Sequence, residues 1–111
     1  MTERIKLVRG DTKPQIRLTL TNEDTNQPIN LSGATVTLHF RAAESDTVLF
    51  SRPAVIIPQH AQNGVVFIDW EDGDLDQEAG SYDGEIEVVT GDGSRETIYD
   101  LLKFRIREDF A

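Results

Sequence analysis

Cysteine is absent from the 111 residues of this chain, and no apolar run approaches the length of a membrane span. Without cysteine, no disulfide holds the fold and no thiolate binds zinc or acts as a nucleophile. A membrane-spanning helix needs about 20 apolar residues, so we expect no membrane span, and because the net charge is negative and disfavours anionic membrane surfaces, we expect no membrane partner. The first residues, Met1 to Arg4, lack the apolar core of a signal peptide, which predicts production in the cytoplasm without Sec export.

Basic residues are also scarce: there are 11 Lys and Arg against 20 Asp and Glu, and the net charge is -9. The imbalance is concentrated in residues 61–100, which hold twelve acidic residues and one basic residue, Arg95. Residues 1–60 hold seven basic and six acidic residues. A nucleic-acid binder needs the opposite sign of charge, so we expect no nucleic-acid partner. The asymmetry is typical of a solvated acidic face, and it also allows the near-neutral part of one molecule to meet the acidic part of a neighbour.

What the sequence does contain is a series of short alternating segments. Apolar and polar residues alternate over 16–21, 35–41, 65–70, 82–89 and 103–107, which is the period of a half-buried strand. Shorter segments at 4–8, 47–51, 54–57 and 97–99 predict further strands, and Asn63-Gly64 and 91–94 predict tight turns. Seven to nine short strands with turn signals about every 8–12 residues favour an all-β antiparallel sandwich. The length fits one domain, residues 1–111.

The inward positions of these strands predict one core between two sheets. The strand at 65–70 carries apolar residues on both faces, so we expect both faces to be covered. The acidic segment from Glu71 to Glu78 is expected to hold one short helical turn around Leu75. The eight aromatic residues are mostly at inward positions, which favours a core over a sugar-binding platform. The predicted core residues are Leu18, Leu38, Phe40, Trp70, Tyr82, Ile86 and Phe104.

Two short motifs suggest binding sites, but each has a simpler structural explanation. Arg9-Gly10-Asp11 is the tripeptide read by integrins, yet a glycine turn between the first two strands accounts for it. The segment Asp72–Asp76 resembles the start of a calcium loop, in which alternating carboxylates supply the oxygens that Ca²⁺ prefers. Gln77 stands where that loop needs glycine, and the flanking apolar helices are missing. We expect an acidic surface turn, and leave cation binding at Asp72–Asp76 open.

No group of residues predicts a reaction. His39 and His60 lack a second histidine or a cysteine at metal-binding spacing, and both are expected to be surface residues. No carboxylate pair accompanies a nucleophile and base, and Gly91-Asp92-Gly93 lacks the lysine and following helix of a phosphate loop. We therefore predict no catalytic, cofactor-binding or metal-binding residue, no cofactor and no enzymatic activity.

A set of segments resembles one known family. They are Gly10-Asp11-Thr12, the strands at 16–21 and 35–41 with the hinge Leu31-Ser32-Gly33-Ala34, the strand at 64–70, the Gly-x-Tyr opening at 80–82, and the late hairpin at 92–97. Together they resemble the N-terminal immunoglobulin-like domain of phage baseplate upper proteins, over about residues 8–107. The motifs are specific as a set and weak singly.

The resemblance implies an immunoglobulin-like sandwich acting as a structural component of a bacteriophage or prophage tail or baseplate. In that family the domain attaches a larger protein to the baseplate, and that protein continues C-terminally. Because this sequence ends at Ala111, we do not expect it to bridge to a fibre through its own tail. The implied location is the virion tail, and the implied partners are other tail or baseplate proteins and, in the assembled particle, further copies of the chain. A carbohydrate-binding or adhesion module is the alternative function, and a small enzyme is the third.

Overall fold

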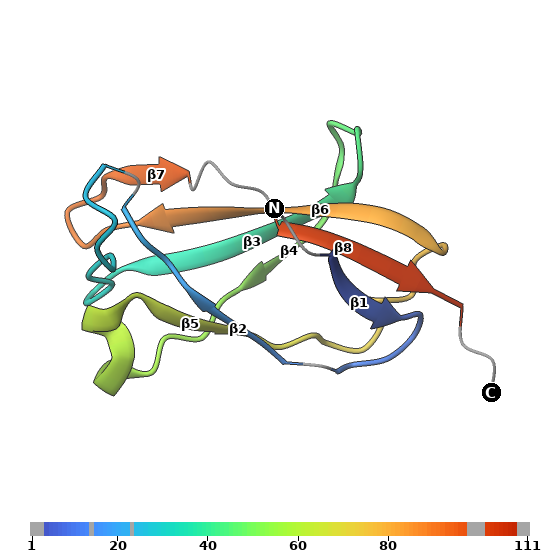
Figure 1. Cartoon of the computed structure of the whole chain (residues 1–111), viewed down its shortest axis with the longest axis horizontal. Helices are drawn as coiled ribbons and strands as arrows, with labels where there is room; N and C mark the ends of the chain where they lie inside the picture. The colour runs from blue at the N-terminus through green and yellow to red at the C-terminus, as the bar shows by residue number, and fades with distance from the viewer. Residues whose placement is uncertain (1–3, 14, 23, 98–101, 109–111) are drawn as a thin grey trace.

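The computed structural model describes residues 4–13, 15–22, 24–97 and 102–108, which form two packed β-sheets (Figure 1). In chain order the strands and the one 3₁₀ helix of these residues are β1 (Arg4–Val8), β2 (Ile16–Thr19), β3 (Thr35–Ala42), β4 (Val48–Pro53), η1 (Pro58–Asn63), β5 (Val65–Ile68), β6 (Gly80–Val89), β7 (Arg95–Thr97) and β8 (Leu102–Arg107). None of the helical structure described is long and apolar enough to cross a membrane.

The larger sheet has the order β1-β8-β6-β3-β4, with β7 also paired to β6, and the smaller sheet consists of β2 and β5. This is the predicted immunoglobulin-like β-sandwich. One pair departs from the antiparallel prediction: β1 and β8 run parallel, with Ile5 opposite Phe104 and Leu7 opposite Ile106. Alternation along a strand reports which side chains face inward, but it contains nothing about the direction of the neighbouring strand. The first and last strands thus lie side by side at one end of the larger sheet (Figure 1).

Two local predictions are wrong. The segment 54–57 is not a strand: after β4, which continues through Pro53, only Val55 forms a bridge with Phe67 of the smaller sheet. Proline is tolerated in β4 because this strand is at an edge. The expected helical turn around Leu75 is a pair of hydrogen-bonded turns. The tight turn predicted at Asn63-Gly64 is confirmed, and it ends a helix, η1, that was not predicted, although a proline at the first helical position is a known start signal.

Other expectations fall partly within the described residues. The predicted strand at 97–99 overlaps the last residue of β7, and 98 and 99 lie outside the described residues. Val65 is buried on the second face of β5 and Phe67 is half-buried, which confirms that this strand is covered on both sides. The hairpin predicted at 91–94 joins β6 to β7, as expected.

The core lies where the alternation predicted it. Six of the seven predicted core residues are buried, and Leu18 is half-buried and packs against the same cluster. Phe40 is at the centre of the aromatic side chains, because its ring centroid lies 4.8 Å from that of Phe50 and 5.2 Å from those of Tyr82 and Phe104. Trp70 meets Phe40 edge to face at 5.9 Å. Such contacts add to the free energy of burial, which is about 25 cal/mol per Å² of apolar surface.

Candidate interaction edges

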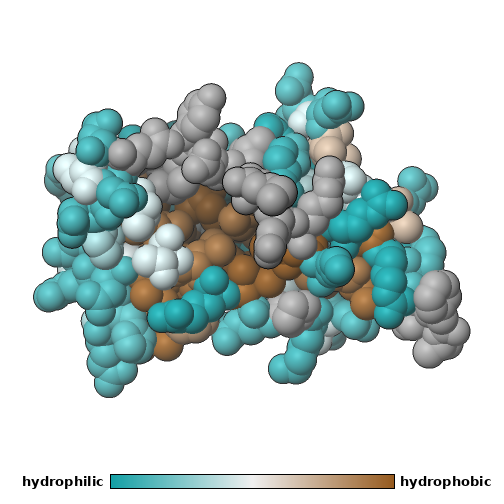
Figure 2. All heavy atoms as spheres, in the orientation of Figure 1, coloured by the Kyte–Doolittle hydropathy of each residue, from teal (hydrophilic) through white to brown (hydrophobic). Residues whose placement is uncertain are grey.

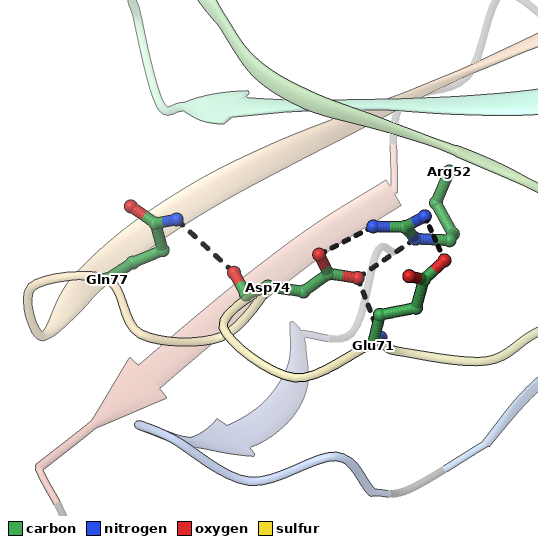
Figure 3. Close-up of polar contacts among 4 residues, drawn as sticks. All are labelled: Arg52, Glu71, Asp74 and Gln77. Carbon is green, nitrogen blue, oxygen red and sulfur yellow. Dashed lines mark hydrogen bonds and ion pairs between the residues drawn. The ribbon is translucent and has the colours of Figure 1, made fainter.

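The acidic turn between β5 and β6 is held by an arginine of the edge strand β4 (Figure 3). Arg52 donates two hydrogen bonds to the carboxylate of Asp74, from Nε to Oδ2 at 2.9 Å and from Nη2 to Oδ1 at 2.6 Å. The Glu71 backbone N–H donates a third to Asp74 Oδ2 at 2.8 Å, and the Glu71 carboxylate accepts from Arg52 Nη1 at 2.5 Å. The hydrogen bonds with Asp74 raise the pKa of Arg52 above its usual value. This bidentate pairing of the Arg52 guanidinium with the Asp74 carboxylate is a strong form of charge-assisted hydrogen bonding.

The turn that resembled a calcium loop therefore has its central carboxylate bound to a guanidinium. Asp74 is buried, Leu75 is fully buried in the core, and Asp76 pairs with Arg9 at 3.0 Å. Within the described part of the chain, no three His, Cys, Asp or Glu side chains converge in a way that could hold a metal ion. The arrangement anchors the turn to β4 on one side and to the residue after β1 on the other.

The Arg9-Gly10-Asp11 segment is the predicted glycine turn. Gly10 has a φ of 85°, which a side chain rarely adopts, and the Asp11 N–H donates to the carbonyl of Val8 at 3.1 Å. The Arg9 side chain pairs with Asp76 and Glu108, each at 3.0 Å, and its hydrogen bond to Asp76 is the main cause of its raised pKa. The tripeptide therefore has a structural role: Gly10 forms the turn after β1, and Arg9 ties this turn to Asp76 and Glu108.

The two histidines lie on different elements. His39, on the outer face of β3, is half-buried: its Nδ1 lies 2.7 Å from Ser51 Oγ and its Nε2 lies 3.6 Å from Glu87. His60 is in η1 and is exposed. The sequence placed His39 on the correct face, but alternation could not show that its neighbours cover it. The same holds for Asp83, an outward residue that is nonetheless buried and pairs with Lys103 at 3.0 Å.

One free edge of the larger sheet is apolar. The large exposed apolar side chains among the described residues are Val48, Leu49 and Val55, which are 47%, 44% and 46% exposed. All three belong to β4 or to the segment that follows it. An exposed edge strand that carries apolar side chains is a ready template for pairing with another chain. The register shift between Phe40 and Arg41 of β3 twists this edge locally.

The opposite edge of the same sheet is basic. Lys6 of β1 stands opposite Arg105 of β8, and Val8 stands opposite Arg107. The three cationic side chains and the neighbouring Leu7 and Val8 line a surface hollow of about 260 Å³. The sequence does not reveal this group, because residues almost a hundred positions apart meet only through the parallel pairing of the first and last strands. The distribution of charge along the sequence was only an indirect sign of this basic edge, because it showed no more than that residues 1–60 are near neutral while residues 61–100 are strongly acidic.

The fold and these edges define a small β-sandwich whose larger sheet ends in two unlike edges. No protein-family model and no curated protein sequence matches the chain. Among solved structures, the crystal structure of CopC from Methylosinus trichosporium OB3b is similar, with a TM-score of 0.50, 10% sequence identity, and coverage of 95% of this chain and 86% of CopC. At this identity the likeness bears on the fold alone, and it supports the sandwich assignment.

Proposed function

We propose that this protein is a non-enzymatic structural component of a bacteriophage or prophage tail or baseplate, in which it acts as a small immunoglobulin-like docking module. The observation that carries the proposal is the pair of free edges of the larger sheet, one apolar at β4 and one basic at β1. Sheet edges offer backbone hydrogen bonds to a partner, and unlike edges allow unlike partners to attach at the two ends. The resemblance of residues 8–107 to the baseplate domain supplies the tail context.

Because the β4 edge and the β1 edge differ in character, they also suit an assembly in which copies of the chain form a ring or a stack. A contact between two different surfaces of the same chain is heterologous, and repeating it around an axis closes a ring. Since each copy has a net charge of -9, contacts between acidic faces repel, and contacts through the apolar or the basic edge are favoured. The proposal therefore places assembly contacts at β1 and β4, and leaves the acidic turn and the outer face of β6 in solvent.

Co-sedimentation tests this function against the carbohydrate-binding alternative. The purified, tagged protein is mixed with tail particles from a strain that lacks its gene, and in parallel with a glycan array. We expect the protein to sediment with the particles and to bind no glycan above the level of a denatured control. Glycan binding without particle binding would favour the adhesion module instead.

A further inference from the structure

The basic edge at β1 holds three exposed cationic side chains. Lys6 is exposed and makes no ion pair with any residue that the structure describes. Arg105 is exposed, and its Nη1 lies 3.3 Å from Ser81 Oγ. Arg107 is exposed and donates from Nη1 to the backbone carbonyl of Glu108 at 2.8 Å. In a chain of net charge -9, three neighbouring exposed cations form a local surface that attracts carboxylates.

The backbone of β1 is open along the same edge. The Arg9 N–H donates to the carbonyl of Arg107 at 2.9 Å, so Arg9 faces β8. Because backbone groups alternate in direction along a strand, Ile5 and Leu7 also face β8, whereas Lys6 and Val8 face the open side. The Val8 carbonyl accepts from Asp11. Among the described residues, the N–H and carbonyl of Lys6 and the N–H of Val8 thus have no strand partner, and they can pair with a further strand.

A strand added here meets two different environments on its two faces. Its outward side chains would lie beside Lys6 and within reach of the β8 guanidinium groups, whereas its inward side chains would lie beside Ile5 and Leu7. Ile5 is only partly buried and packs against the core. Figure 2 shows apolar side chains gathered between β2 and the strands of the larger sheet.

We propose that the free edge of β1 binds an extended segment of another protein in which carboxylate and apolar residues alternate. The carboxylates face the surface that Lys6 and Arg105 form beside Arg107, the apolar residues face the side of β1 that carries Ile5 and Leu7, and the backbone continues the larger sheet beyond β1. The inference specifies the partner of the docking module and rests on the proposed function only in taking that partner to be a tail protein. A second copy that pairs its β4 edge with β1 would supply apolar side chains but no carboxylate, so such a contact in a ring leaves the cations unmatched, and a different protein with carboxylates fits the whole surface better.

A pair of synthetic peptides tests the inference: one in which glutamate and valine alternate, and one in which lysine replaces each glutamate. Binding is followed by amide NMR of the full chain. We expect the glutamate peptide to shift the amide signals of β1, to slow hydrogen exchange of the Lys6 and Val8 N–H groups, and to bind more weakly as salt rises. Lys6→Glu should weaken binding by about tenfold. Arg95→Glu, which makes the same charge change at an exposed residue of β7, should have little effect.

Several outcomes would overturn the inference: equal binding of the lysine peptide, shifts confined to β4, equal weakening by Lys6→Glu and Arg95→Glu, or no shift at saturating peptide. The amide spectrum of each variant reports at the same time whether it is folded, so loss of fold cannot pass for loss of binding. If the peptide fails to bind but the protein is found in tail particles, this inference alone fails. If the peptide binds but the protein is absent from particles, the docking role in the tail fails.

Discussion

At the residue scale, Gly64 is the backbone position on which the junction between η1 and β5 depends. It has a φ of 73°, and a Cβ atom there would lie 2.4 Å from the carbonyl oxygen of Leu20. Gly33 has nearly the same φ, 74°, but a Cβ atom there would meet open space. The comparison separates the two penalties of replacing glycine, conformational strain and steric overlap.

We therefore expect Gly33→Ala to lower the free energy of unfolding by about 1–2 kcal/mol, the usual strain of a left-handed residue. Gly64→Ala should lower it by at least about 2 kcal/mol more, since a backbone oxygen must also move. Urea denaturation of both variants measures the difference. Equal losses would mean that the chain around Leu20 relaxes freely.

Asp74 is the most consequential buried charge, because its carboxylate is 8% exposed and holds Arg52 in two hydrogen bonds. Asp74→Asn removes the charge and leaves a guanidinium in a partly buried site. We expect a loss of about 3 kcal/mol of unfolding free energy, at the lower end for a broken buried pair. The control is Glu71→Gln: that carboxylate contacts the same arginine but is 69% exposed, so its loss should cost less than about 1 kcal/mol. Thermal melts of both variants would contradict this role if Glu71→Gln proved the more damaging.

Asp92 gives a pH-dependent prediction. The hydroxyl of Thr90 donates to its carboxylate at 2.5 Å and the Ser94 N–H donates at 2.9 Å, and these bonds lower the pKa of Asp92 to about 2. Because the folded pKa is below the unfolded one, the contribution of this group to stability is present above about pH 4 and is lost as the pH falls towards 2. Carboxyl NMR titration should give a midpoint near that value, and Thr90→Val should raise it. A midpoint unchanged by Thr90→Val would show that the hydroxyl is not the main cause.

At the scale of elements, the sequence predicted the positions of the strands better than it predicted which strands pair with one another. In β3, the alternation of Val36, Leu38 and Phe40 with polar residues identified both the strand and its buried face. The segment 54–57 has the same apolar character but forms only one bridge, because the chain there crosses from one sheet to the other. The apolar character of a segment indicates that its side chains are buried. Whether the segment forms a strand also depends on which distant strand lies beside it.

The same reason explains what was missed at the candidate edges. Lys6 and Arg105 become neighbours through a parallel pair that no local pattern reports. The contact of Arg52 with Asp74 likewise joins an edge strand to a turn between other strands. By contrast, Gln77 and the lack of flanking apolar helices argued from the sequence alone against a helix-flanked calcium loop around Asp72–Asp76, and cation binding by this turn stays a matter for experiment.

The acidic turn is the element whose metal dependence can be tested. Since the Asp74 carboxylate is bound to Arg52 and Asp76 to Arg9, calcium would have to displace two ion pairs to bind there. We expect the thermal midpoint in excess EDTA to match that in millimolar Ca²⁺. A rise of many degrees with Ca²⁺ would contradict this, because a ligand that binds the folded state raises its stability by mass action.

At the scale of the whole molecule, charge and edges together limit how copies and partners meet. The net charge of -9 opposes contact between acidic faces, whereas the two ends of the larger sheet are apolar at β4 and basic at β1. An isolated copy can still be monomeric, because small interfaces often need the rest of an assembly to hold. The assembly that we propose would form in a tail particle, and a monomer in dilute solution agrees with that proposal.

Mass spectrometry of purified particles tests the central claim most directly. Virions or induced prophage particles are purified through two density gradients, and this protein is quantified against the major tail protein, with an abundant cytoplasmic host protein as the control for contamination. The account predicts that the protein remains at a constant ratio to the tail protein through both gradients while the host protein is lost. Absence of the protein from intact particles, in cells that express it, would contradict its role as a structural component.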